Sequence, residues 1–461
     1  MRQTFFSDKN SIKLFKNISI LHNDLRNYAN IEDKNKPLIV AAILLALNSN
    51  SFDELFSNSS KTDGENLIEA VKNSLNRVKV VKKVEFLKQF SFLKDNKKLN
   101  EINDSLKLTP LRYFANFLYE NIVKTANKNC SQDYLGRFYD EFMSYSSDGQ
   151  NLGIILTPKH IAELFCDLLD LKATDKVLDP TCGTAGFLIA SLHKMLEKST
   201  INNFDRVKNQ LFGIEEQAYM FSIAKTNMIL KNMQSCNLEN SDFLKLNPKD
   251  IKEKKACNIG MMNPPYSMGS KQNPKLYEIN FVKHLLDSII DGGKVAVIVP
   301  QSSFSGRSKE EASLKKEILE NHTLNGVITL NKNSFYGVGT NPCIAIFTAS
   351  IPHDFNKECK FINFEDDGYE VAKHIGLVET NLAQSKKRYL LDVWFDKLEA
   401  SEDFCIKTTI NHSDDWLYSY FYFCKDIPKE DDFSKTISDY MTFEVNMLTN
   451  NRGYLFGIED E

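Results

Sequence analysis

The middle of the chain alternates short apolar runs with longer amphipathic stretches, and this rhythm constrains the fold more than any other feature. The stretches, such as residues 187–196 and 281–290, have the apolar spacing of helices. The short runs are bounded by turn residues and suit buried strands: residues 176–178, 211–214, 259–262 and 294–299. Strands that alternate with helices form parallel sheets with crossover helices. The sequence therefore predicts an α/β fold.

Two later runs, residues 326–330 and 343–347, flank a glycine-rich loop. We expect them to form an antiparallel strand pair at the edge of the sheet. Beyond residue 350 the periodicity weakens and aromatic residues mix with acidic ones. The interpretation is a domain at 131–350, followed by an acidic extension at 351–461 that contacts other subunits.

Residues 1–130 have a different pattern, which predicts a helical N-terminal domain. Pro37 precedes the apolar run 38–47, as expected for a buried helix that begins at a proline. Basic residues outnumber acidic ones in this part, whereas the total net charge is −4. The basic excess could lie near phosphates or could simply be a solvated helical surface. The acidic C-terminal part is a poor candidate for an independent DNA-binding domain.

The bulk composition excludes several classes of protein. A chain of 461 residues, 42% hydrophobic and 26% charged, predicts a globular protein of two or three domains. No apolar run approaches the roughly 20 residues of a membrane span, and we see no signal peptide. The nine cysteines form no CxxC pair and the eight histidines lack ligand spacing, so we expect no metal site and a reducing cytoplasm.

The first motif follows the strand expected at 176–178. It reads Asp179-Pro180-Thr181-Cys182-Gly183-Thr184-Ala185-Gly186 and leads into a helix. Small residues let the backbone approach a ligand closely, and a helix N-terminus favours electron-rich groups. Alone this pattern is also typical of a tight turn between strand and helix.

Three further positions favour a nucleotide-like cofactor. Glu215 ends the second strand, where a carboxylate can accept two ribose hydroxyl hydrogen bonds. Asp242 could accept from an adenine amino group, or could only cap a helix. Thr157-Pro158 precedes another helix, either as its N-cap and first residue or as a segment that covers the cofactor's amino-acid end.

The second motif, Asn263-Pro264-Pro265-Tyr266, leaves the strand expected at 259–262 at its carboxyl end. Two prolines fix the backbone, so the Asn263 side-chain oxygen and the Pro264 carbonyl can converge on one amino group. Both would accept from its hydrogens, and Tyr266 would stack on the attached ring. The chemistry expected is attack of that nitrogen on the methyl group of a sulfonium cofactor. A base in duplex DNA would have to be flipped out to reach it.

With these motifs the sequence resembles the N6-adenine DNA methyltransferases, and specifically the modification subunit of type I restriction–modification systems. The resemblance covers most of residues 130–350. It includes both motifs, Thr157-Pro158-Lys159-His160, and segments at 133–139, 292–300 and 333–337. The resemblance implies a Rossmann-like sheet, S-adenosylmethionine as cofactor, and catalytic roles for Asn263, Pro264, Pro265 and Tyr266. For cofactor binding it implies Thr157, Pro158, Asp179, Pro180, Cys182, Gly183, Thr184, Gly186, Glu215 and Asp242.

The resemblance also implies partners. Members of the family usually read double-stranded DNA through a separate specificity subunit, so we expect a hetero-oligomer, with a restriction subunit as a further component. The family usually has Ser-Gly-Gly where this chain has Thr184-Ala185-Gly186. From its position in the loop, Cys182 itself is interpreted as a packing residue.

Other interpretations remain open from the sequence. A glutamine amide of a protein could occupy the same clamp. A combined restriction and modification enzyme would need a nuclease centre, and the residues around Asp250 and Glu253 are interpreted as a solvated charge run instead. A non-catalytic subunit that keeps the fold is the remaining alternative, and the intact motifs argue against it.

Overall fold

The computed structural model describes most of the chain. The described residues are 9–48, 52–77, 83–129, 134–146, 156–199, 204–232, 237–270, 272–305, 309–335, 339–372, 376–423 and 430–449. They divide into two compact units, residues 1–420 and residues 421–461. Parts of the motifs, Asp133, Tyr336 and Gly337, lie outside the described residues, as do Cys130, Cys236 and Cys424.

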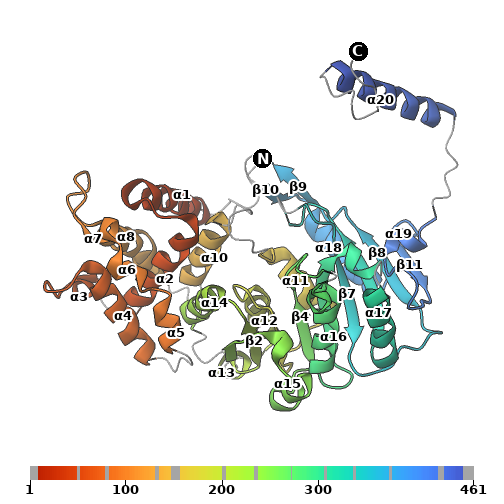
Figure 1. The fold of residues 1–461 in the computed structure, drawn as a ribbon, viewed down its shortest axis with the longest axis horizontal. Coiled ribbons are helices and arrows are strands. Elements are labelled where there is room, and N and C mark those ends of the chain that lie inside the picture. Colours follow the sequence, from red (N-terminus) through yellow and green to blue (C-terminus); the bar gives the residue numbers. More distant parts are fainter. Residues whose placement is uncertain are drawn as a thin grey trace. The chain divides into compact units, whose positions relative to one another are not determined.

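The N-terminal part of the first unit is helical, as expected. The buried helix predicted after Pro37 is confirmed, because every residue of α2 is buried. Figure 1 shows these helices in red to yellow. Their bounds are α1 Lys9–Ala29, α2 Lys36–Leu47, α3 Phe52–Leu55, α4 Asp63–Arg77, α5 Lys83–Lys88, α6 Phe92–Asp95, α7 Lys97–Asn100, α8 Pro110–Leu118, α9 Lys124–Asn129 and α10 Tyr134–Ser146.

A nine-stranded sheet forms the rest of the first unit, in the order β11-β8-β6-β7-β5-β4-β1-β2-β3. Only β7 and β11 run against the other strands of this sheet. The strands are β1 Val177–Asp179, β2 Leu211–Glu215, β3 Asn237–Asn240, β4 Ile259–Met262, β5 Lys294–Pro300, β6 Thr323–Leu330, β7 Pro342–Thr348, β8 Cys359–Phe364 and β11 Cys405–Thr408. Since seven strands are parallel, their carboxyl ends meet at one edge, where ligands bind in such sheets.

Helices cover both faces of the sheet. One face packs against α11 Lys159–Leu168, α12 Gly186–Glu197 and α18 Ala383–Trp394 in a shared apolar core. Gly260 points to the opposite face, because side chains alternate along a strand, and a Cβ there would lie 3.2 Å from Leu285 Cδ1 in α16. The remaining helices are α13 Phe204–Lys208, α14 Ala218–Leu230, α15 Pro248–Lys255, α16 Glu278–Ser288, α17 Lys309–Asn321 and α19 Tyr418–Phe421.

The helix α14 joins the helical part to the sheet part. Its residues Met220, Ile223, Ile229 and Leu230 belong to the core of the N-terminal helices. Phe221, Ala224 and Met228, on the same helix, belong to the core beneath the sheet. One helix is therefore buried by both parts, which explains why α14 has no polar face.

The structure differs from the sequence predictions at the far end of the sheet. The antiparallel pairing of β6 with β7 is confirmed, but the pair is internal, because β8 and β11 extend the sheet beyond it. The boundary expected at residue 350 thus falls between two strands of one sheet. The pattern was weak there because β8 pairs in parallel with β6 and buries residues on both faces, so its apolar positions do not alternate.

A short hairpin and a C-terminal helix complete the described elements. The strands β9 Tyr369–Ala372 and β10 Gly376–Glu379 pair antiparallel in a sheet of their own. The second unit contains α20, Glu430–Thr449. None of the helices in the described part of the chain is both long and apolar enough to cross a membrane.

Candidate active site

The loop after β1 is held in shape by its own backbone and by the neighbouring strand. The Cys182 amide donates to the Ile214 carbonyl of β2 at 2.9 Å. Gly183 has φ +52° and Ala185 has φ +69°, both in the left-handed region that favours glycine. The glycine usual at position 185 in the family is therefore explained by backbone conformation, and Ala185 adopts that conformation with its methyl group fully buried.

Glu215 fastens this loop to the end of β2. Its carboxylate accepts from the Gly183 amide at 2.9 Å and from the Gln217 amide at 2.8 Å. The side chain is largely buried, and burial raises the pKa of Glu215 above that of an ordinary glutamate. The residue thus fixes the loop and keeps a carboxylate beside it.

Thr181 and Thr157 bind Asn263 from two sides. The Thr181 hydroxyl donates to the Asn263 backbone carbonyl at 3.0 Å. The Asn263 side-chain nitrogen donates to Thr157 Oγ1, also at 3.0 Å. The interpretation of Thr157 as an N-cap is wrong, because α11 has its cap at Pro158 and the threonine hydroxyl serves Asn263 instead.

The side-chain oxygen of Asn263 has no hydrogen-bond partner within the described part of the chain. Asn263 Oδ1 is buried and accepts no hydrogen bond from the described residues. Leaving a buried acceptor unpaired costs about 1–3 kcal/mol. The acceptor predicted to bind an amino group is therefore present, oriented by Thr157 and available to a donor.

Tyr266 is the last residue of the Asn263–Tyr266 motif, and its side chain is held in place at both the hydroxyl and the ring. Its hydroxyl donates to the Ile298 carbonyl of β5 at 3.4 Å, and its ring meets Phe335 edge-on with centroids 6.0 Å apart. Burial raises the pKa of Tyr266 well above that of an ordinary tyrosine. The ring is therefore a neutral, fixed wall rather than an acid or base.

A cavity of about 190 Å³ gathers most of the predicted residues. It is lined by the predicted residues Pro180, Gly183, Glu215, Asp242, Asn263, Pro264, Pro265 and Tyr266. The sequence did not single out the apolar wall formed by Met220, Phe243 and Phe281. Only the position of Phe243, directly after Asp242, gave a signal for that wall.

Asp242 caps a helix and also lines the smaller cavity. Its Oδ1 accepts from the Leu244 amide at 3.1 Å, so the capping role is confirmed. Its Oδ2 pairs with Lys245 at 2.9 Å, and the residue lines the 190 Å³ cavity. Capping therefore does not remove Asp242 from the ligand's surroundings.

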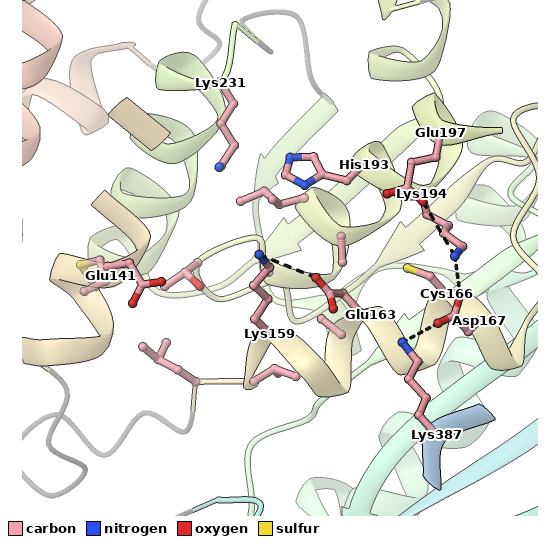
Figure 2. Close-up of a pocket in the computed structure, with 18 residues that line it drawn as sticks. Glu141, Lys159, Glu163, Cys166, Asp167, His193, Lys194, Glu197, Lys231 and Lys387 are labelled. Carbon is pink, nitrogen blue, oxygen red and sulfur yellow. Dashed lines mark ion pairs between the residues drawn. The ribbon is translucent and has the colours of Figure 1, made fainter. Parts of the chain in front are cut away.

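A larger cavity of about 490 Å³ lies beside α11 and α12 (Figure 2). It contains the predicted residues Thr157, Thr184 and Gly186. Figure 2 shows Lys194 and Lys387 converging on Asp167, each with an ion pair of 2.6 Å. Lys194 also lies 3.9 Å from Glu197, so carboxylates pair with both lysines and this part of the cavity is not a strong anion site.

Three predicted residues line neither cavity. Pro158 is the N-cap of α11, Asp179 is the buried last residue of β1, and Cys182 is buried against Gly213. A Cβ on Gly213 would lie 2.4 Å from Leu238, 2.9 Å from Leu188 and 3.1 Å from Cys182 Sγ. The thiol thus fills the space that this glycine leaves open, in agreement with the packing role.

We expect Gly213→Ala to destabilise the protein by about 1–3 kcal/mol, because the added methyl group overpacks this core. The measurement is the apparent melting temperature, with Cys182→Ala as a companion variant that removes only the thiol. A melting temperature equal to that of the wild type would contradict the tight packing.

We expect Asp179→Asn to stabilise the protein at pH 8. Only 1% of Asp179 is exposed, and its Oδ1 accepts from the Thr181 amide at 3.3 Å. Burial, and then the charge of Glu215, raise the pKa of Asp179 well above its usual value. A raised folded-state pKa means that the protonated form stabilises the fold at acidic pH and that this stability is lost as pH rises through that pKa.

The isosteric amide avoids this loss, which should raise the free energy of unfolding at pH 8 by roughly 1–3 kcal/mol. The apparent melting temperature of Asp179→Asn should then exceed that of the wild type by a few degrees. The difference should shrink as pH is lowered. A variant that is less stable than the wild type at pH 8 would show that the carboxylate is compensated in the fold.

Comparisons with known proteins agree with this geometry. The family model "N-6 DNA Methylase" matches residues 130–441. The type II restriction enzyme and methyltransferase RM.BcgI of Heyndrickxia coagulans is 42% identical over 452 residues, which are 95% of this chain and 71% of that protein. The type I restriction enzyme MjaVII methylase subunit of Methanocaldococcus jannaschii is 25% identical over 308 residues, 60% of this chain and 52% of its own length.

Solved structures share the fold at low identity. A chain from a type I restriction–modification assembly has a TM-score of 0.64 at 16% identity, with 97% of this chain and 99% of that chain covered. The methyltransferase subunit of a type I system from Streptococcus thermophilus has a TM-score of 0.62 at 16% identity, covering 87% and 96%. The α/β sheet with a helical N-terminal part is therefore the fold of these subunits.

Proposed function

The chain belongs to the N-6 DNA methylase family, and on that premise we propose that it transfers a methyl group from S-adenosylmethionine to N6 of an adenine flipped out of DNA. The observation that carries the proposal is the unpaired Asn263 Oδ1, fixed by Thr157 beside the cavity residues. The amino group of adenine is a donor that this acceptor can bind.

The residues fit the cofactor in two places. Glu215 and Asp242 would hold the ribose and adenine in the smaller cavity, against Met220, Phe243 and Phe281. Thr157, Thr184 and Gly186 would face its amino-acid end from the larger cavity. When bound, the sulfonium supplies an electrophilic methyl group.

The chain's own groups prepare the nucleophile. Asn263 Oδ1 and the Pro264 carbonyl would accept the two hydrogens of the adenine amino group, which raises electron density on its nitrogen. Tyr266 would stack on the base, and the Thr181 bond to the Asn263 carbonyl holds the loop at its start. No covalent enzyme intermediate is needed, and the six cysteines of the described ranges are all buried.

The test is a map of N6-methyladenine in the genome of the native strain and of a strain lacking this gene. We expect one set of sites to lose methylation on deletion and to regain it with the wild-type gene, but not with Asn263→Ala. An unchanged map would overturn the proposal. Methylated glutamine in a protein, detected by mass spectrometry, would support the alternative substrate.

A partner that reads the DNA site is proposed from the second unit. The α20 helix exposes Phe433, Ile437, Tyr440, Met441 and Leu448 at helical spacing. Its sequence is acidic, with one lysine among several aspartates and glutamates. These features support docking of an apolar helix with basic flanks, as a specificity subunit of a hetero-oligomer would provide.

Charged substitutions on the two sides of α20 test this docking. Ile437→Asp and Met441→Asp should abolish co-purification of the native partner from the native strain, while S-adenosylmethionine binding is retained. Thr442→Asp, on the polar side, is the matched control. Co-purification that all three variants preserve would refute α20 as the docking helix.

The 42% identity to RM.BcgI favours a second arrangement, in which modification is combined with restriction. The charged residues around Asp250 and Glu253 do not support a nuclease centre. Asp250 and Lys254 form an exposed pair at 3.4 Å on α15, and no group of three metal-holding side chains occurs in the described ranges. Cleavage of unmethylated plasmid by the purified native complex with Mg²⁺ would separate the two arrangements.

A further inference from the structure

Two loops that contain none of the predicted site residues leave the sheet at the same edge as the active site. Asn331 follows β6 and Asp367 follows β8 by three residues. These strands are hydrogen-bonded neighbours in parallel register, with Leu330 opposite Phe364. The carboxyl ends of both strands therefore lie at the same edge of the sheet as those of β4 and β5, from which the antiparallel strand β7 separates them.

The two residues form a buried node joined by several hydrogen bonds. Asn331 donates to Asp367 Oδ1 at 2.9 Å and to the Tyr369 carbonyl at 3.1 Å. Its own oxygen accepts from the Asn333 amide at 2.9 Å, and Asp367 Oδ1 also accepts from the Tyr369 amide at 2.9 Å. Since Asn331 and Asp367 are both buried, this Asn331–Asp367 node is a rigid junction of three segments.

The segment that follows Asn331 reaches Tyr266, the last residue of the Asn263–Tyr266 motif. The turn that starts at Asn331 places Phe335 in the core, where it meets the Tyr266 ring at an interplanar angle of 88°. Edge-to-face contacts of this kind fix the orientation of both rings.

The segment that follows Asp367 reaches His160, which lies close in sequence to the Thr157 that contacts Asn263, the first residue of the motif. The Tyr369 ring stacks on His160 with centroids 4.1 Å apart and planes 19° from parallel. Burial lowers the pKa of His160 to about 4, so the imidazole is neutral at physiological pH. His160 lies three residues after Thr157, whose hydroxyl accepts from Asn263.

We propose that Tyr369, seated by the Asn331–Asp367 node, is a positioning residue for methyl transfer that acts through His160 and Thr157 on the Asn263 amide. This role rests on the proposed function. The node thus holds residues that orient both ends of the Asn263–Tyr266 motif. Phe335 contacts Tyr266, and Tyr369 stacks on His160, which is three residues after Thr157. Displacements of about 1 Å at a reacting group can cost about 100-fold in rate.

The decisive comparison is Tyr369→Ala with Tyr369→Phe, because the stack uses the ring and not the hydroxyl. Each allele replaces the native gene on the chromosome, and the initial rate of N6-adenine methylation after induction is measured per molecule of protein. We expect Tyr369→Ala to be about 10–100-fold slower. Tyr369→Phe should match the wild type.

A second pair of variants addresses the node itself. Asp367→Asn keeps the Oδ1 acceptor for Asn331 and Tyr369, whereas Asp367→Ala removes it. The alanine variant should lose rate like Tyr369→Ala, and the asparagine variant should retain it. The far-UV circular dichroism spectra of the purified full-length chains should be unchanged in all of them, which a general loss of folded protein would not produce.

A readout independent of activity is the side-chain amide NMR signal of Asn263, assigned by its disappearance in Asn263→Asp. It should shift in Tyr369→Ala and not in Tyr369→Phe. Equal methylation rates and an unshifted amide signal in Tyr369→Ala would overturn the positioning role while the wild type still methylates DNA. Absence of methylation by the wild type would contradict the proposed function instead, and the amide signal would still decide the positioning.

Discussion

Replacing Asn263 with alanine is expected to slow methyl transfer by about 100- to 1,000-fold, because the acceptor that orients and polarises the target amino group is lost. The Asn263 side chain binds only Thr157 among the described residues, and its Oδ1 is free for the substrate. Its removal should therefore affect the chemical step far more than the fold. The measurement is a single-turnover rate with tritiated S-adenosylmethionine and the native complex.

The control for this variant is Thr157→Val, which keeps the shape but removes the hydroxyl that orients the amide. We expect an intermediate loss of rate, because Asn263 retains its oxygen but not its anchor. Full activity of Asn263→Ala would contradict the clamp, whatever the behaviour of the threonine variant.

Replacing Glu215 with glutamine should weaken S-adenosylmethionine binding by about 10- to 100-fold, since hydrogen bonds to a charged group contribute about 1.5–3 kcal/mol. The carboxylate already accepts from Gly183 and Gln217, so ribose hydroxyls would bind its remaining lone pairs. Glutamine turns one of these acceptors into a donor, which cannot accept from a hydroxyl. Isothermal titration calorimetry measures the change.

Glu253→Gln, on the surface helix α15, is the matched control and should bind the cofactor like the wild type. Because the pKa of Glu215 is raised, wild-type affinity should also fall as pH drops through that value, and this fall should be absent in Glu215→Gln. Equal affinity of the wild type and Glu215→Gln at pH 8 would refute the ribose contact.

The parts of the site that follow strands could be predicted from sequence, because apolar runs mark the strands and a parallel sheet brings their ends together. Glu215 and Asn263 were placed beside the cavity in this way, whereas Asp179, which also follows an apolar run, lines neither cavity. Thr157 was assigned to the correct motif but given the wrong bond, since its partner Asn263 is 106 positions away. A Thr-Pro pair before a helix looks the same in sequence whether the threonine caps the helix or binds a distant side chain.

The Asn331–Asp367 node was missed for a related physical reason. Asn331 and Asp367 lie in short polar turns whose composition is typical of any loop, and the pairing of β8 with β6 joins them. The apolar positions of β8 do not alternate, so the register of its pairing with β6 cannot be inferred from the sequence pattern. Local periodicity cannot show which distant strand a weakly patterned strand pairs with.

The two threonine bonds to Asn263 have a thermodynamic consequence. Thr181 belongs to the cofactor loop and Thr157 to the segment beside the larger cavity, so both elements that would hold S-adenosylmethionine also hold the clamp. Any cofactor-induced shift of either element changes the free energy of base binding. Linkage then requires that bound DNA tighten the cofactor by the same factor by which the cofactor tightens DNA.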